Sequence, residues 1–223
     1  LALTYSAFYF RIIKIFKDVK IDFSLLTKRK GFIINNYFIV LTGSFHGQID
    51  KLIIMPILGS SIVGNYSLSL QIIAVMMIIT SILFKYMVPE EASGKNIKQI
   101  QKILIITSIG LTLIGFFIVP NILPTIFPEY TDSVDAIRIM SLAIIPLSIV
   151  KIYTSKFLAL EKSKFIIIGM IISLSVLIPS MIIFGELYGV SGIAASYLLA
   201  IIVQCTYFII LSKKIKKYPK ENV

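Results

Sequence analysis

The chain has 223 residues and a mass of 25.0 kDa; hydrophobic residues make up 57% of it, and its mean hydropathy is +0.92. Charged residues make up only 15%, against roughly 25% in ordinary soluble domains, and so few charges exclude a typical cytosolic enzyme and an intrinsically disordered chain. The net charge of +11 in such an apolar chain indicates loops beside anionic lipid, rather than a nucleic-acid partner.

Apolar runs separated by short polar breaks predict where the chain crosses a membrane. A spanning helix needs about 20 apolar residues, and the continuous runs disfavour the alternating strands of a membrane barrel. In chain order, we expect the end of a transmembrane helix over 1–10, a basic cytoplasmic connector over 11–30, spans over 32–58, 62–84, 103–127, 136–160, 165–184 and 190–211, and a basic cytoplasmic tail over 213–223. The sequence therefore predicts an all-α, polytopic transmembrane helix bundle with a six-helix lobe over 31–212.

The ends and connectors of the chain allow further expectations. The sequence begins at Leu1 without a recognisable signal peptide, so we expect a piece of a longer protein. The connector over 11–30 mixes apolar and basic residues, which suits either an amphipathic surface helix or a solvated connector. The polar stretch over 89–102 suits a short surface helix with Pro89 near its first turn.

The distribution of basic residues predicts the orientation in the membrane. The stretches 11–30, 85–102, 156–164 and 213–223 hold 19 of the 22 lysines and arginines, whereas the opposite turns over 59–66, 128–135 and 185–191 hold none. Basic residues accumulate on the cytoplasmic side of membrane proteins. We therefore expect a multi-pass protein of the cytoplasmic (inner) membrane with its C-terminus in the cytoplasm.

A first polar cluster interrupts the run over 32–58. His46 and Asp50 are four residues apart and share a helical face, and Lys51 lies beside that face. Charged groups inside a membrane are costly and commonly line a functional cavity. The cluster therefore suits a cavity with a cation for an anionic headgroup and a His/Asp pair that can take protons. The alternative is that these residues lie near the outer headgroups.

A second cluster lies on the span over 136–160. Its polar side chains fall within an arc of about 140° around a helix, with a proline on the opposite side that should kink the helix. The polar members are Arg138, Ser141, Ser148, Lys151 and Ser155, and the proline is Pro146. This pattern suits a water-filled lumen that attracts anions. The alternatives are an ion pair of Arg138 with Asp135 or Asp132, and a Lys151 ammonium that reaches the inner surface.

Motifs of soluble enzymes are absent from the sequence, and one histidine with one cysteine cannot form a zinc site. We therefore expect no enzymatic activity and no cofactor, although proton or sodium coupling stays open. Gln71 and Gln204 suit interhelical hydrogen bonds better than ligand contacts. Tyr66 suits an aromatic anchor at the outer interface.

Two successive motifs resemble a known family. The stretch Gln48–Gly59 has an Asp followed by a basic residue, then a hydrophobic run that ends in Leu-Gly; the stretch Val63–Leu68 reads Val-Gly-Asn-Tyr-Ser-Leu. Both resemble the seventh and eighth helices of Wzx-type O-antigen and oligosaccharide flippases, in the multidrug/oligosaccharidyl-lipid/polysaccharide exporter superfamily. Similar features follow at Val88–Glu90, Leu158–Lys164 and Tyr188–Ala195, whereas the family's Gly-x-Pro is Gly31-Phe32-Ile33 here.

The resemblance covers essentially the whole chain, as the C-terminal half of a twelve-helix protein. It implies a lobe like that of the multidrug exporters, facing a second lobe across a cationic cavity. The implied substrate is a polyprenyl-diphosphate-linked oligosaccharide, which is flipped for surface polysaccharide biosynthesis. The resemblance adds weight to Lys51, Asp50, Arg138 and Lys151 as cavity residues, but no family motif supports His46.

Two other functions are compatible with the sequence, and a non-functional fragment is a further alternative. A drug or cation antiporter of the same superfamily would need carboxylates deep in its cavity, and an intramembrane transferase would need acid and base groups at one interface. The expected partners are the lipid-linked oligosaccharide, membrane lipids, and the N-terminal lobe of the same protein or a second copy of this chain. Polysaccharide polymerase machinery is a further expected partner.

Overall fold

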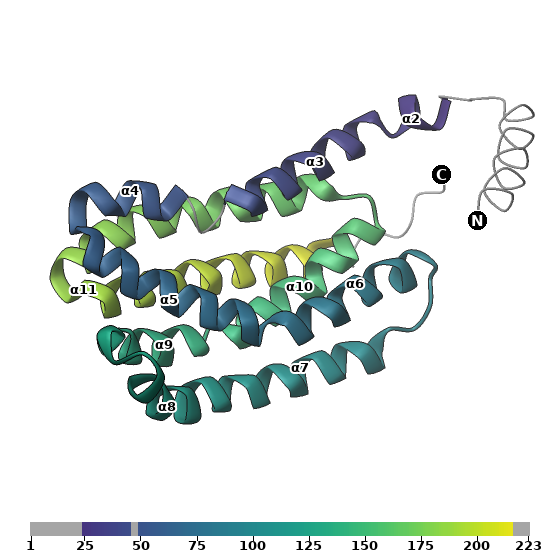
Figure 1. Ribbon diagram of the computed structural model, residues 1–223. Helices are drawn as coiled ribbons and strands as arrows, with labels where there is room; N and C mark the ends of the chain where they lie inside the picture. Colours follow the sequence, from purple (N-terminus) through teal and green to yellow (C-terminus); the bar gives the residue numbers. More distant parts are fainter. Residues whose placement is uncertain (1–23, 46–48, 216–223) are drawn as a thin grey trace, which may run out of the picture. The chain divides into compact units, whose positions relative to one another are not determined.

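A computed structural model of the chain describes residues 24–45 and 49–215 (Figure 1). All regular elements within these residues are helical, and the described part contains no strand. The prediction of an all-α helix bundle is therefore confirmed. The predicted helix end over 1–10, most of the connector over 11–30 and most of the tail over 213–223 lie outside the described residues.

The chain divides into two compact units, Leu1–Ile34 and Asn35–Val223. The described part of the first unit holds α2 (Ser24–Lys28) and the start of α3 (Lys30–Phe45). The second unit holds the rest of α3 and the remaining elements: α4 (Ile49–Leu58), α5 (Ser60–Met76), α6 (Ile78–Ala92), α7 (Lys98–Leu113), a π-helical turn η1 (Ile114–Ile118), α8 (Val119–Ile126), a 3-10 turn η2 (Pro128–Tyr130), α9 (Ser133–Ser141), α10 (Ile144–Ala159) and α11 (Ser163–Ile215).

The helices of the second unit coincide with the predicted apolar runs. Within the described residues, Lys98–Ile126 and Ser163–Lys214 are long and apolar enough to cross a membrane. The pairs α5–α6 and α9–α10 satisfy the same criteria as bent spans, with bends of 51° and 43°, which gives up to four candidate spans. The first predicted run, 32–58, corresponds to α3 and α4, on either side of the undescribed residues 46–48.

Helix α11 is a hairpin rather than one rod. At 1.5 Å per residue, 52 helical residues would extend about 78 Å, far more than the roughly 30 Å of a bilayer core. Gly189 interrupts the helix with φ 59° and ψ −135°, a conformation that favours glycine. The two halves then run back alongside each other, since Ser173 Oγ donates a hydrogen bond to the Ala200 carbonyl at 3.4 Å (Figure 1). The two halves correspond to the predicted spans over 165–184 and 190–211.

The two bent pairs have local causes for their bends. Between α5 and α6, the hydroxyls of Thr80 and Ser81 both donate to the Met77 carbonyl, at 2.9 and 2.8 Å, and such bonds bend helices. Between α9 and α10, Pro146 lacks the N–H that would bond the Leu142 carbonyl one turn earlier. The predicted kink at Pro146 is confirmed. The bent pairs pack together, α5 on α9 and α6 on α10.

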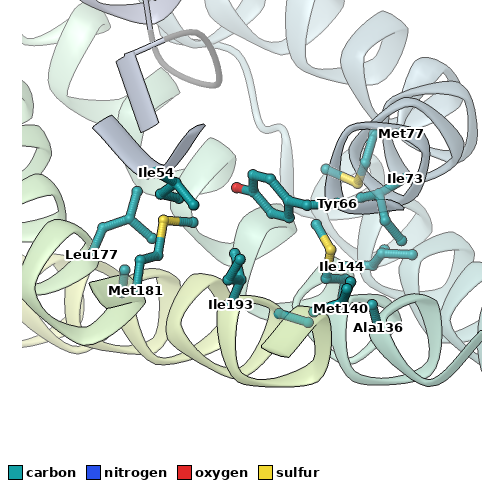
Figure 2. Packing of buried hydrophobic residues seen from close by; sticks show 13 residues of the cluster. Ile54, Tyr66, Ile73, Met77, Ala136, Met140, Ile144, Leu177, Met181 and Ile193 are labelled. Carbon is teal, nitrogen blue, oxygen red and sulfur yellow. The ribbon is translucent and has the colours of Figure 1, made fainter. Parts of the chain in front are cut away.

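The core of the second unit lies among α4, α5, α9, α10 and α11 (Figure 2). Ile54, Ile73, Met140, Leu177 and Ile193 belong to this cluster. Tyr66 is also there with no exposed surface, so the prediction that it is an interfacial anchor is wrong. The cause is the packing of α5 against α9 and α11, which encloses that side of α5.

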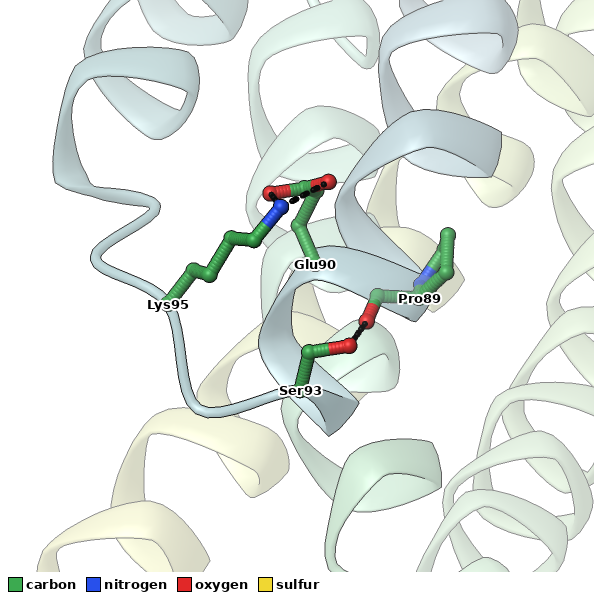
Figure 3. Close-up of polar contacts among 4 residues, drawn as sticks. All are labelled: Pro89, Glu90, Ser93 and Lys95. Atoms are coloured by element: carbon green, nitrogen blue, oxygen red, sulfur yellow. Dashed lines mark hydrogen bonds and ion pairs between the residues drawn. The ribbon is translucent and has the colours of Figure 1, made fainter.

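A capped turn connects α6 to α7 (Figure 3). Gly94 has φ 75°, and the N–H groups of Gly94 and Lys95 donate to the carbonyls of Glu91 and Glu90 at 3.0 and 3.1 Å. The Lys95 ammonium lies 3.0 Å from the Glu90 carboxylate, and this hydrogen bond raises the pKa of Lys95. The predicted surface helix over 89–102 is therefore wrong: α6 continues past Pro89, and α7 begins at Lys98.

The hairpin of α11 predicts a sharp sensitivity at Gly192. A Cβ atom at this position would clash with the Phe184 carbonyl oxygen, which belongs to the helical backbone and not to a flexible side chain. We expect Gly192→Ala to lower the free energy of unfolding by about 3 kcal/mol, measured by thermal denaturation in detergent. The control is Gly110→Ala, because a Cβ there meets open space. Equal losses in both variants would contradict the packing described for this hairpin.

Candidate functional site

A cavity of about 410 Å³ lies within the second unit. It is bounded by the end of α3, by α4, by α5, by α10 and by the second half of α11. Its polar lining comes from Lys51, Gln71 and Tyr197, and its apolar and small lining residues are Gly43, Leu70, Ile73, Ala74, Met77 and Leu147. The cavity is open rather than enclosed, and its volume and mixed lining lie within the range of ligand-binding clefts.

Lys51 lies where the sequence predicted a cavity cation. It follows Asp50 in the first turn of α4, and its side chain is partly buried in the cavity wall. Asp50 belongs to α4, but its side chain is not among those described. His46 lies outside the described residues. The predicted His/Asp pair therefore stays a prediction, whereas a cationic group in a cavity of the bundle is observed.

Lys151 lies on α10, one helical turn after the lining residue Leu147. Its ammonium donates hydrogen bonds to Thr80 Oγ1 at 2.9 Å and to Ser81 Oγ at 2.8 Å. Among the side chains that the structure describes, no carboxylate lies within ion-pair distance of this ammonium. The alternative prediction placed the Lys151 ammonium at the inner membrane surface. The ammonium instead donates its hydrogen bonds to hydroxyls of α6 inside the bundle.

The two hydroxyls that accept from Lys151 are themselves donors. Thr80 and Ser81 direct their hydrogens to the Met77 carbonyl at the α5–α6 bend, and accept from the ammonium with their lone pairs. A hydroxyl can do both at once, and connected hydrogen bonds of this kind strengthen one another in a low-dielectric interior. This arrangement keeps a charged group inside the bundle without a described counterion, and it connects α10 to the bend.

Arg138 occupies a different environment. Its guanidinium lies 3.0 Å from the Asp135 carboxylate three residues earlier; the Asp135 side chain is exposed, and the Arg138 side chain is partly exposed. It is not among the cavity-lining residues. The alternative that assigned Arg138 to an ion pair with Asp135 is therefore confirmed, and the structure does not bring Arg138 together with Lys51.

The serines of the predicted polar stripe do not line an open lumen. Ser141, Ser148 and Ser155 have no exposed surface, because α10 and the end of α9 pack that side against neighbouring helices. Ser155 donates a hydrogen bond to the Glu91 carboxylate at 2.7 Å, which joins α10 to α6. Serines at such positions allow close helix packing. Along α10, it is Leu147 that faces the cavity.

Several polar residues of the site were missed from the sequence. Gln71 was expected in an interhelical hydrogen bond, but it lines the cavity, and Tyr197 was not singled out. Thr80 and Ser81 were also missed, although an adjacent hydroxyl pair inside the apolar run over 62–84 was a visible signal. Among the residues that the structure describes, no group of histidines, cysteines and carboxylates could hold a metal ion.

The resemblance to oligosaccharide flippases rests on sequence motifs alone. Comparisons with protein families, with curated proteins and with solved structures give no match.

Two of the motifs nevertheless have a physical role here. In Val63–Leu68, Asn65 Oδ1 accepts a hydrogen bond from Ser133 at 2.8 Å, which fixes α5 to α9. In Tyr188–Ala195, Gly189 and Gly192 allow the reversal of α11.

The contacts of Lys151 predict strong energetic coupling with the two hydroxyls. The double substitution Thr80→Val and Ser81→Ala should lower the free energy of unfolding by about 3 kcal/mol, because a buried ammonium loses its acceptors. In a Lys151→Met background, the same double substitution should lower the free energy of unfolding by about 1 kcal/mol or less. Denaturation in detergent measures both values.

A matched control uses the same two substitutions elsewhere. Thr206 and Ser93 also donate to a carbonyl four residues earlier, at 2.8 and 2.9 Å, but both are exposed, and no lysine donor is described for their hydroxyls. Thr206→Val with Ser93→Ala should change stability little. Additive effects of Lys151→Met and the Thr80/Ser81 pair would show that the ammonium does not depend on these acceptors.

Proposed function

We propose that the chain is one lobe of a membrane transporter that flips an anionic, lipid-linked oligosaccharide across the cytoplasmic membrane. The observation that carries this proposal is the cavity lined by Lys51, with the Lys151 ammonium held one helical turn beyond its wall. Ammonium groups in a low-dielectric setting attract phosphate and carboxylate groups strongly. A soluble ligand is a weaker candidate, because the cavity belongs to a bundle of apolar helices.

The other lining residues suit an amphiphilic ligand. Gln71 and Tyr197 offer hydrogen-bonding groups that sugar hydroxyls can use, while Leu70, Ile73 and Leu147 present an apolar wall. In the proposed mechanism, the cations hold the anionic head in the cavity while the lipid tail stays in the bilayer. The lobe then rocks between states that open to either side, as transporters with broken helices do.

An antiporter for drug cations has less support from the cavity. Such a protein needs carboxylates where the cation binds, and the described lining of the cavity contains a lysine and no carboxylate. The transferase alternative needs a convergent acid and base, and the only candidates were His46 and Asp50, whose side chains are not described. We therefore propose that the substrate is transported without chemical change. Proton or sodium coupling is compatible with this proposal.

The proposed transporter requires partners and an orientation. The cavity needs a second wall from an N-terminal lobe of the same protein or from a second copy of this chain, since a cationic cavity that faces lipid is costly. The basic loops place the C-terminus in the cytoplasm in this proposal. Polysaccharide polymerase machinery would receive the flipped substrate.

Removal of the two cations tests the proposed function. Lys51→Ala and Lys151→Ala should each reduce surface polysaccharide in the source cells at least about tenfold, the effect of one lost charge contact of about 1.4 kcal/mol. Polysaccharide is measured by immunoblot of cell extracts, and the amount of the protein in the membrane by a blot of the same cells. Lys95→Ala is the control, because Lys95 belongs to an exposed ion pair outside the cavity.

The variant with both lysines replaced tests the cationic-cavity mechanism most directly. Normal surface polysaccharide in a Lys51→Ala, Lys151→Ala strain that keeps the protein in its membrane would contradict the cationic-cavity mechanism. Loss of polysaccharide in the Lys95→Ala strain as well would show that the assay reports general damage to the protein.

A further inference from the structure

Met77 contacts both the cavity and a hydroxyl that accepts a hydrogen bond from Lys151. Its side chain lines the cavity together with Leu147 and Ile73. On its other side, Thr80 Oγ1 lies 3.4 Å from Met77 Sδ, and the same Thr80 oxygen accepts a hydrogen bond from the Lys151 ammonium at 2.9 Å. The path from the cavity to the second cation thus runs through one methionine side chain and one hydroxyl.

This methionine is suited to move. Methionine is unbranched, has three rotatable side-chain bonds and adapts to irregular space. Met77 also lies at the junction of α5 and α6, where the axis bends by 51°, rather than within a straight helix. It is 8% exposed and packs at the edge of the core cluster beside Ile73 (Figure 2). These features suit the Met77 side chain to a change of rotamer.

The charges on the two sides of Met77 define what would occupy a joined site. Lys51 lines the cavity, and Lys151 has hydroxyl acceptors but no described carboxylate within ion-pair distance. A ligand with one phosphate needs only one of these ammonium groups. A ligand with two linked phosphates carries more negative charge over a greater length, and can contact two cations at once.

We propose that Met77 is a movable partition that separates Lys51 from Lys151, and that its displacement joins the two cations into one site selective for a diphosphate over a monophosphate. This inference rests on the proposed function, since it specifies the head of the same anionic lipid. It makes Met77 a specificity-determining residue, although the side chain itself carries no charge.

Binding of two isoprenoid probes tests the selectivity. The purified full chain in detergent is titrated with farnesyl diphosphate and with farnesyl monophosphate. Met77→Ala should bind the diphosphate about tenfold more tightly than wild type, because the ligand no longer has to displace Met77 before it contacts Lys151, while monophosphate binding changes less than about twofold. The gain should disappear when Lys151→Met is added.

Ile73→Ala provides a matched control. Ile73 lines the same cavity one turn before Met77 and is 2% exposed, so its truncation enlarges the cavity without opening the way to Lys151. A similar gain for Ile73→Ala, or a gain for Met77→Ala that persists with Lys151→Met, would overturn the inference. Wild-type binding with no gain in Met77→Ala would overturn it too, and would leave the proposed function intact.

A second measurement tests the partition without any phosphate ligand. In a Cys205→Ala background, Lys151→Cys is treated in membranes with an anionic, water-soluble methanethiosulfonate. We expect slow labelling when Met77 is present, labelling at least about tenfold faster with Met77→Ala, and no increase with Ile73→Ala. Equal rates with and without Met77 would overturn the partition. Faster labelling without binding of either isoprenoid probe would overturn both the diphosphate selectivity and the proposed function.

Discussion

The hydrogen bonds of one ammonium group organise the centre of this bundle. The Lys151 ammonium is costly among apolar helices unless oxygen atoms accept hydrogen bonds from it, and Thr80 and Ser81 supply those oxygens. The same two hydroxyls bond the Met77 carbonyl, where α5 gives way to α6. The hydrogen-bond acceptors that Lys151 on α10 needs are thus supplied at the junction of α5 and α6, which also forms part of the cavity wall.

Much of the fold was predictable from the sequence, because lipid imposes simple rules. Within the described residues, the predicted spans are helical, some with a bend or a π-helical turn, since backbone groups in a membrane must be satisfied internally. The kink at Pro146 was also predictable, because proline lacks an N–H. Hydropathy says nothing about which neighbour covers a given helical face. This explains why Tyr66 was placed at an interface, and why the surface helix at Pro89 was expected where α6 continues.

The candidate site was predicted less completely, because a cavity depends on how helices meet. Lys51 was found from its charge within an apolar run, and it does line the cavity. The serines near Lys151 share its helical face, but burial depends on the neighbouring helices, and these enclose Ser141, Ser148 and Ser155. Gln71 and Tyr197 carry no charge, so only the assembled helices reveal their place in the wall. Asn65 and Ser133 are 68 residues apart in the sequence, which explains why their hydrogen bond could not be foreseen.

The paired bends also bear on hydrophobic mismatch. Helices α5 and α6 contain 17 and 15 residues, and if they formed one straight rod they would extend roughly 48 Å, well beyond a bilayer core of about 30 Å. A rigid rod of this length matches a thinner membrane only by tilting as a whole. Helices α9 and α10 bend as well and pack on α5 and α6, so both bent pairs extend less far in one direction than straight rods of the same length. A bent span of this kind matches a thinner bilayer core than a straight rod of the same length would, and the bend between α5 and α6 lies where Thr80 and Ser81 accept hydrogen bonds from Lys151.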